Sequence, residues 1–354
     1  MARLRQPRSE NGCKVARIVE RACWFLAIFF MLASNQNLRQ TLSLEREEAG
    51  EAKGSQNNGL DDDDVVAAPY AKSNTKVHTG SHLDPMFRLA YQESLGFFTD
   101  ITNDAWRRRR TITHERNHYG QVDPNNRAYH RSAAWYQINW DPDFACLHED
   151  EIGGNHDGHK WICDPHRLRD KPDCLVYSFG SNNEFMFELH VKHILPNCDI
   201  HIFDPTDYTA GMKGAGLDAT YHPWGLAASY TTKQSDTENS QVTHLVSDSA
   251  RKGKFRTLED TMEELGHTGR RVDIFKIDCE GCEWKTHKDF LKQDIRQILV
   301  ETHEVVPSSM DFFDDIHDAG YVMFHKEPNI QHAAGRCIEF AFLKLAPEFF
   351  RHSK

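Results

Sequence analysis

From Cys174 onward, short apolar runs alternate with segments whose apolar residues recur at the spacing of a helix face. We expect strands at residues 175–179, 200–203, 272–277 and 298–300. We expect helices at residues 184–195, 257–265, 283–291 and 308–319. Two final strands, 321–324 and 338–345, follow each other without a helix between them. Such a series predicts an α/β fold with a mostly parallel sheet whose last strand is antiparallel.

Two turns of this region have residues suited to an adenosine cofactor. Gly180 follows the first strand, where a glycine lets the backbone approach a ligand closely, and Ser181 and Asn183 precede the next helix. The turn lacks the full glycine pattern of a dinucleotide site, which counts against NAD. Asp204 ends the second strand, where an acid is placed to bind ribose hydroxyls. The alternative for Asp204 is a turn residue before Pro205.

A third turn concentrates acidic side chains. The segment KIDCEGCEW, residues 276–284, places Asp278, Glu280 and Glu283 at the carboxyl end of a buried-type strand. Carboxylates this close repel one another unless cations or hydrogen bonds compensate. Because ligands bind at this edge of an α/β sheet, the cluster predicts a functional site.

The order of these motifs resembles the methyltransferase domain of methyltransferase-like proteins related to FkbM. The segments that carry the resemblance are VYSFGSNNEFMFE, IFDPT, GLAAS, TLEDTMEELGH, VDIFKIDCEGCEW and ILVETHE. The segment GHKWICDP, residues 158–165, resembles the lead-in of the branch that includes methyltransferase-like protein 24. The resemblance covers about residues 144–346. Cys279 and Cys282 depart from it, since valine and alanine are commoner there.

The resemblance implies a Rossmann-like fold with a seven-stranded sheet, and S-adenosylmethionine as the cofactor. It places Gly180, Ser181 and Asn183 around the amino-acid end of that cofactor and Asp204 at its ribose. Asp278 and Glu280 would lie beside the sulfonium and the incoming acceptor. Members of the wider group are associated with O-methylation of sugar-like or secondary-metabolite hydroxyls, which implies a small or glycan-like acceptor.

A hydroxyl acceptor benefits from a general base near the operating pH. Glu301 and His303 end the strand of ILVETHE and point toward the same sheet edge. We expect His303 to be the base, with Glu301 orienting it or binding the acceptor, so that His303, Glu301 and Glu280 form the acceptor side. The alternative is a loop histidine that only caps or packs.

The cysteines favour disulfides over a metal site. Seven follow the N-terminal segment, so at least one thiol stays free even under oxidising conditions. Cys146 is expected to pair with Cys163 or Cys174. Cys279 and Cys282 form one C-x-x-C without the second that a four-sulfur zinc site needs. Structural zinc, a catalytic disulfide and a divalent cation on the carboxylates stay open as lesser alternatives, and no metal is expected.

The N-terminus suggests a membrane or secretory setting. Basic residues precede an apolar run at 22–33, which indicates a signal anchor, or a signal peptide, within residues 1–34. Residues 35–82 are expected to be a disordered stem, 83–169 an extension of the domain, 170–346 the methyltransferase domain and 347–354 a tail. This predicts a single-pass membrane or secretory-pathway protein, in contact with the membrane only through its anchor.

Charge and motifs narrow the function classes. The net charge of −11 argues against a nucleic-acid partner. A Rossmann-like domain that binds without turnover is one alternative to a methyltransferase, and a secretory-pathway glycosyltransferase is another. No Asp-x-Asp motif in a nucleotide-sugar setting supports the glycosyltransferase. The oligomeric state is left open.

Overall fold

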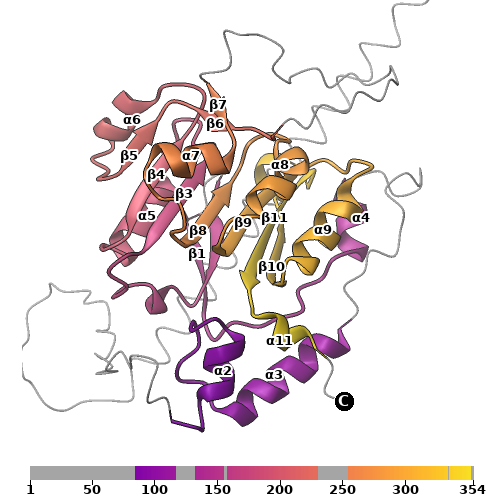
Figure 1. The fold of residues 1–354 in the computed structure, drawn as a ribbon. Coiled ribbons are helices and arrows are strands. Elements are labelled where there is room, and N and C mark those ends of the chain that lie inside the picture. Colours follow the sequence, from indigo (N-terminus) through magenta and orange to yellow (C-terminus); the bar gives the residue numbers. More distant parts are fainter. Residues whose placement is uncertain (1–83, 117–131, 155–157, 230–253, 334, 352–354) are drawn as a thin grey trace, which may run out of the picture. The chain divides into compact units, whose positions relative to one another are not determined.

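The computed structural model describes residues 84–116, 132–154, 158–229, 254–333 and 335–351. Its centre is a seven-stranded sheet in the order β10-β11-β9-β8-β3-β4-β5 (Figure 1). β11 runs antiparallel to both of its neighbours, and the other neighbouring strands pair in parallel. The expected Rossmann-like methyltransferase architecture is therefore confirmed.

The sheet strands are β3 (Leu175–Phe179), β4 (Asp199–Phe203), β5 (Thr220–His222), β8 (Val272–Ile277), β9 (Ile295–His303), β10 (Tyr321–Pro328) and β11 (Cys337–Lys344). Two small sheets are formed by β1 (Glu149–Ile152) with β2 (Lys160–Cys163), and by β6 (Gly225–Leu226) with β7 (Phe255–Arg256). The helices are α2 (Arg88–Glu93), α3 (Asn103–Glu115), α4 (Ser132–Ile138), α5 (Met186–Ile194), α6 (Thr209–Gly214), α7 (Leu258–Glu264), α8 (Glu283–Phe290), α9 (Ser309–Asp318), α10 (Ile330–Ala333) and α11 (Pro347–Phe350), with a 3-10 turn at Pro165–Arg167.

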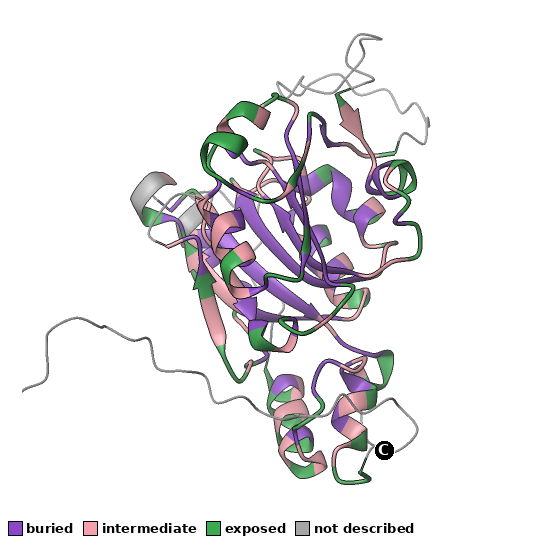
Figure 2. Ribbon diagram, turned by 90° about the vertical axis from the view of Figure 1, so that its left-hand side faces the viewer, coloured by how far each residue is buried: buried purple, intermediate pink, exposed green. Residues whose placement is uncertain are grey.

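The two faces of the sheet carry separate apolar cores because side chains alternate along each strand. On one face, Val176 and Ile274 pack with residues of α5 and of the β1–β2 hairpin. On the other, Tyr177 and Phe275 pack with residues of α4, α7, α8 and α9. The central strands are buried along nearly their whole length (Figure 2). Both faces of a parallel sheet must be covered in this way, since neither is polar.

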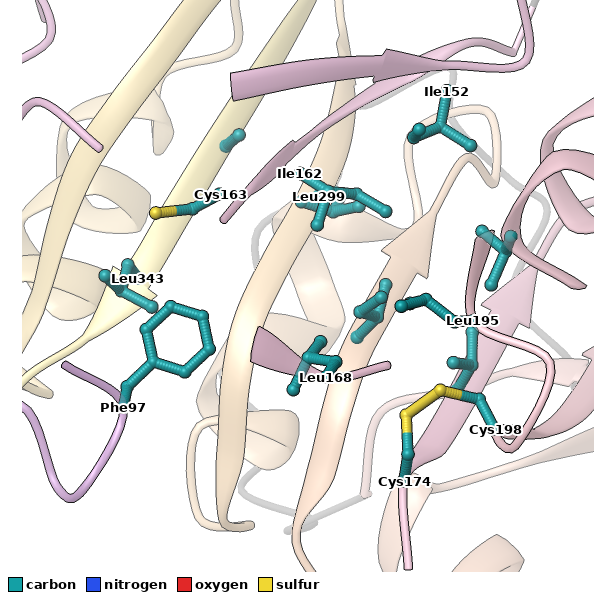
Figure 3. Close-up of a cluster of buried hydrophobic side chains, with 14 of the residues drawn as sticks. Phe97, Ile152, Ile162, Cys163, Leu168, Cys174, Leu195, Cys198, Leu299 and Leu343 are labelled. Carbon is teal, nitrogen blue, oxygen red and sulfur yellow. A yellow bond between two sulfur atoms is a disulfide. The ribbon is translucent and has the colours of Figure 1, made fainter. Parts of the chain in front are cut away.

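Two disulfides fasten the face that carries the hairpin, and one of them, between Cys174 and Cys198, is drawn in Figure 3. Cys174 and Cys198 join the amino ends of β3 and β4, and Cys146 is bonded to Cys163 at the end of β2. Cys146 was expected to pair with Cys163 or Cys174, and its bond to Cys163 confirms the first of these two pairings. A third disulfide joins Cys279 and Cys282, which leaves Cys337 free among the described cysteines.

The sequence pattern located most elements but not their ends. The expected capping box of Thr257 with Asp260 is present at the start of α7. β9 extends three residues beyond the expected strand at both ends, and β5 was not expected at all. The region expected to be a tail begins with α11, whose Phe349 is buried against Trp106.

The expected signal segment and stem, residues 1–82, lie outside the described residues. Across the described ranges, no helix combines the length and the apolar character needed to cross a membrane.

Candidate active site

The site forms where the sheet reverses its strand order. The chain runs from β3 outward through β4 to β5, and later from β8 outward in the opposite direction to β9. β3 and β8 are neighbours, and the carboxyl ends of the strands at such a reversal are where α/β sheets bind ligands. Gly180 follows β3 and Asp278 follows β8, which brings the first and third predicted turns together.

Gly180 and Asp278 are in direct backbone contact. Gly180 has φ +83°, and a Cβ atom built on it would lie 1.7 Å from the backbone oxygen of Asp278. Lys276 Nζ donates to the Gly180 carbonyl at 3.0 Å, and the Asp278 amide donates to the Phe179 carbonyl at 3.0 Å. The glycine is therefore required by the approach of the β8 loop, a different reason from the close ligand approach that the sequence suggested.

The turn after Gly180 is held by Asp204. One carboxylate oxygen of Asp204 accepts from the Asn182 amide at 3.0 Å, and the other accepts from the Thr206 amide at 2.8 Å. Ser181, which is part of this turn, is buried. Asn183 has φ +66° and is exposed, with its amide oxygen against Gly211 of α6. Each Asp204 oxygen still has lone-pair capacity for a hydroxyl donor.

Asp278 lies beside a lysine that the sequence did not single out. Lys160 of β2 is 1% exposed, and its Nζ lies 3.3 Å from Asp278 Oδ2 and 2.8 Å from Glu339 Oε1 of β11. Burial would raise the pKa of Asp278, but Lys160, Lys276 and His303 together lower it. Burial raises the pKa of Glu339 to about 8 despite its lysine partner. A buried cation here stabilises the ionised Asp278.

His303 ends β9 and is surrounded by carboxylates. Its Nδ1 lies 3.2 Å from Glu283 Oε1, which also accepts the His303 amide at 2.8 Å. Its Nε2 lies 3.5 Å from Glu280, 3.8 Å from Glu301 and 3.9 Å from Asp278. Glu280 is highly exposed, whereas the other three carboxylates are largely or fully buried. The carboxylates of Glu280, Glu301 and Asp278 thus surround one nitrogen of the His303 imidazole, Nε2.

The protonation of His303 follows from these neighbours. Burial would lower its pKa, but the hydrogen bond to Glu283 and the charges of Glu283, Glu301 and Asp278 raise it to about 9. Burial and the charge of Asp278 raise the pKa of Glu301. At neutral pH His303 therefore carries a proton in this arrangement, which bears directly on its predicted role as a base.

A pH-dependent contribution to stability follows. Because the folded-state pKa of His303 exceeds the unfolded value of about 6.5, its contribution is fully present below pH 6.5 and is lost as pH rises through 9. We expect the difference in unfolding free energy between the wild type and His303→Gln to shrink across this window, by at most about 3 kcal/mol. Urea unfolding at several pH values measures it.

The matched control for that measurement is His193→Gln, on an exposed residue of α5. The unfolding free energy of every variant also falls as pH rises toward 8, because the pKa of Glu339 is raised in the folded state. Only the difference between the wild type and His303→Gln therefore isolates the contribution of His303. A difference that stays constant from pH 6 to pH 9.5 would show that the pKa of His303 is not raised.

Comparison with known proteins decides the family. A family model described as a methyltransferase domain matches residues 88–344. The chain belongs to this methyltransferase family. It is also 26% identical over 145 residues to the human protein named probable methyltransferase-like protein 24, across 39% of this chain and 34% of the human one. The match therefore spans about a third of that relative.

Two solved structures resemble this chain, with lower sequence identity than the human relative. The precorrin-6y C5,15-methyltransferase of Geobacter metallireducens matches with TM-score 0.29 and 9% identity, over 51% of this chain and 84% of that one. The fibrillarin pre-rRNA processing protein of Methanococcus jannaschii matches with TM-score 0.31 and 8% identity, over 56% and 83%. Scores this low say nothing about substrate.

The methyltransferase fold implies S-adenosylmethionine as the methyl donor, and the side chains at this edge of the sheet fit that cofactor. That cofactor carries a sulfonium, an ammonium group and a ribose diol. Asp278 offers a carboxylate to positive charge, and Asp204 offers acceptor oxygens to hydroxyls. Gly158 lies close to Asp278, since a Cβ there would lie 3.8 Å from Asp278 Oδ2.

Sequence reasoning missed three residues of this candidate site. Lys160 was quoted only within a lead-in segment, and Asn329, which donates to Glu301 Oε1 at 2.9 Å, was not considered. Glu339 gave a usable signal, because an acid inside the apolar run IEFAF breaks the pattern of a buried strand. Among the predicted residues, Asn183 points toward α6, away from Asp278's partners.

Proposed function

We propose that this methyltransferase transfers a methyl group from S-adenosylmethionine to a hydroxyl of a small or glycan-like acceptor. The observation that carries the proposal is the imidazole of His303 at the carboxyl end of β9. Its Nε2 faces Asp278 and Glu280, and its Nδ1 is held by Glu283. An oriented imidazole at the ligand-facing edge is the arrangement that hydroxyl activation needs.

Five residues have defined tasks in this proposal. When bound, S-adenosylmethionine supplies an electrophilic methyl group. Asp204 binds the ribose hydroxyls, while Asp278 faces the positive charge of the donor. Gly180 keeps the first turn close to Asp278. Glu283 holds the ring of His303, and the acceptor hydroxyl gives its proton to His303 Nε2.

The proton on His303 sets a condition for that step. With a pKa of about 9, the basic form is a minor fraction at neutral pH. The carboxylates of Glu283, Glu301 and Asp278 maintain this value, after the opposing effect of burial. A positive ligand charge beside Asp278 would offset part of their field and lower the pKa of His303 toward neutrality. The acceptor step is therefore proposed to depend on occupation of the donor subsite.

A second candidate is a binding domain without turnover. It is favoured by the same raised pKa, since a protonated imidazole ringed by carboxylates makes a site for a hydroxylated ligand without base chemistry. The glycosyltransferase alternative is not proposed, because the chain belongs to a methyltransferase family.

Calorimetric titration of the full chain with S-adenosylmethionine and with its demethylated product tests the donor half. We expect binding of both, and at least a tenfold loss of affinity in Asp204→Asn. Asp207→Asn, on an exposed acid three residues away, is the matched control and should bind as the wild type does. Binding of neither compound, or equal binding by Asp204→Asn, would overturn the proposal.

Methyl transfer from labelled donor into candidate hydroxyl acceptors separates the two candidate functions. Incorporation that rises with pH and is lost in His303→Gln supports the enzyme. Donor binding without incorporation into any acceptor supports the binding domain.

We further propose the secretory pathway or a single-pass membrane anchor as the setting. The apolar run at residues 22–33 and the three disulfides of the described region support it, because disulfides persist in oxidising compartments. Protease protection in sealed microsomes tests this setting, and digestion of the folded domain without detergent would contradict it.

A further inference from the structure

A second group of chemically active side chains lies at the opposite edge of the sheet from the candidate active site. Asp199 begins β4, His201 follows two residues later on the same strand, and His267 lies in the turn between α7 and β8. One ligand atom from each of these three residues lies within 4.8 Å of the other two. We call them the histidine–aspartate cluster.

His201 contributes a buried nitrogen that lacks a hydrogen bond. The residue is 7% exposed, and its Nδ1 lies 2.8 Å from His222 Nε2. Its Nε2 is fully buried and makes no hydrogen bond with any residue that the structure describes, although it lies 3.1 Å from Asp199 Oδ2. A buried polar nitrogen without a hydrogen bond is costly, so this atom points to a ligand between the two residues.

His267 is oriented toward the same place. It is 8% exposed, its Nδ1 lies 2.6 Å from the Tyr177 hydroxyl, and its ring packs edge-on against His201 with 4.9 Å between ring centres. His222 and Tyr177 thus fix the two imidazoles through one nitrogen each. Metal-binding histidines are held in this way by partners behind the ligand atoms.

We propose that Asp199, His201 and His267 form a zinc-binding site. Two imidazoles and a carboxylate are ordinary zinc ligands, and ligand atoms about 2.0–2.2 Å from a tetrahedral ion lie about 3.3 Å from one another. The 3.1 Å between His201 Nε2 and Asp199 Oδ2 is close to that spacing. Because the Asp199 side chain is about half exposed, water has access to the fourth position.

Zinc here would act as a structural link at the amino edge of the sheet. It would join the start of β4 to the turn before β8. The Cys174–Cys198 disulfide already joins the starts of β3 and β4, and the Asp199 amide donates to the Cys174 carbonyl at 2.9 Å. This link is independent of the proposed methyl transfer.

Arg270 is the competitor for the proposed ion. Its Nη1 lies 3.9 Å from Asp199 Oδ2, and its side chain is partly exposed. A guanidinium opposes binding of a cation to the same carboxylate. Replacement of Arg270 by glutamine is therefore expected to tighten zinc binding, an effect that simple loss of folding could not produce.

The test is competition titration of zinc into the chelator-stripped full chain. We expect one zinc per chain, at least tenfold weaker binding in Asp199→Asn and His267→Gln, and tighter binding in Arg270→Gln. His193→Gln, on an exposed histidine, and Cys337→Ser, beside the active-site carboxylates, should bind as the wild type does. Saturation should raise Tm by about 5 °C.

Cobalt substitution of the wild type gives a second measurement, which does not depend on whether the variants fold. We expect the visible bands of tetrahedral cobalt without the near-ultraviolet band of a cobalt–thiolate bond. No zinc binding by the wild type, or equal binding by Asp199→Asn and His267→Gln, would overturn the proposal. A thiolate band that disappears in Cys337→Ser would place the ion near Glu301 and His303 and would overturn it as well.

Discussion

Replacement of Lys160 by methionine should lower the free energy of unfolding by about 3 kcal/mol. Lys160 is 1% exposed and is the buried cation between Asp278 and Glu339. Without it, Asp278 keeps its burial penalty and loses its nearest positive charge. The cost falls at the lower end of the range for a broken buried pair, because Glu339, whose pKa is already about 8, can be neutralised by a proton. Urea unfolding at pH 7 measures the change.

Two further variants make the result specific. Lys288→Met removes an exposed lysine that lies 3.4 Å from Asp315 and should cost less than about 1 kcal/mol. Adding Glu339→Leu to Lys160→Met should recover part of the loss, since removal of both partners leaves fewer buried charges. A loss for Lys160→Met no larger than that for Lys288→Met would show that the buried lysine does not compensate Asp278.

Replacement of Gly180 by alanine should abolish binding of the methyl donor and destabilise the fold by more than about 2 kcal/mol. The new Cβ would lie 1.7 Å from the backbone oxygen of Asp278, so one of the two loops must move. Movement of Asp278 also changes its contacts with Lys160 and His303. Donor binding by calorimetry and unfolding by urea are the two measurements.

Gly266 provides the matched control for this substitution. It also has a positive φ, of +68°, but a Cβ there meets no atom within 4 Å. Gly266→Ala should therefore cost only the conformational penalty of about 1–2 kcal/mol and leave donor binding unchanged. Equal effects of the two substitutions would mean that backbone strain, and not the contact with Asp278, explains the requirement for glycine.

The fold could be predicted because its determinants are local in the sequence. Apolar periodicity marked β3, α5, β8 and β9, and the close succession of the last two strands marked the antiparallel β11. The expectation that no helix lies between those two strands was wrong, because the four-residue helix α10 lies there. β5, Thr220–His222, escaped because three residues make too short a pattern, and its place in the sheet comes from pairing with β4. The β1–β2 hairpin was missed because β1 is mostly polar and each strand has only four residues.

The candidate site was predictable only in part, since its contacts join distant segments. Asp278 and Glu280 follow β8, and Glu301 and His303 lie at the carboxyl end of β9, so the edge they share could be inferred. The contact of Lys160 with Asp278 spans 118 residues, and nothing local signals it. The protonated state of His303 depends on the distances to its surrounding carboxylates, which no sequence pattern specifies.

The position of Lys160 bears on where the smallest independently folding piece of this chain begins. Motifs alone would place the start of the domain at residue 170, after the hairpin. A polypeptide trimmed to that point would leave Asp278 and Glu339 without their shared cation, and it would uncover the apolar surface beneath Ile162. Such a fragment should be insoluble on expression. The hairpin therefore belongs to the methyltransferase domain itself, and truncation that preserves folding must begin upstream of Cys146, the partner of Cys163.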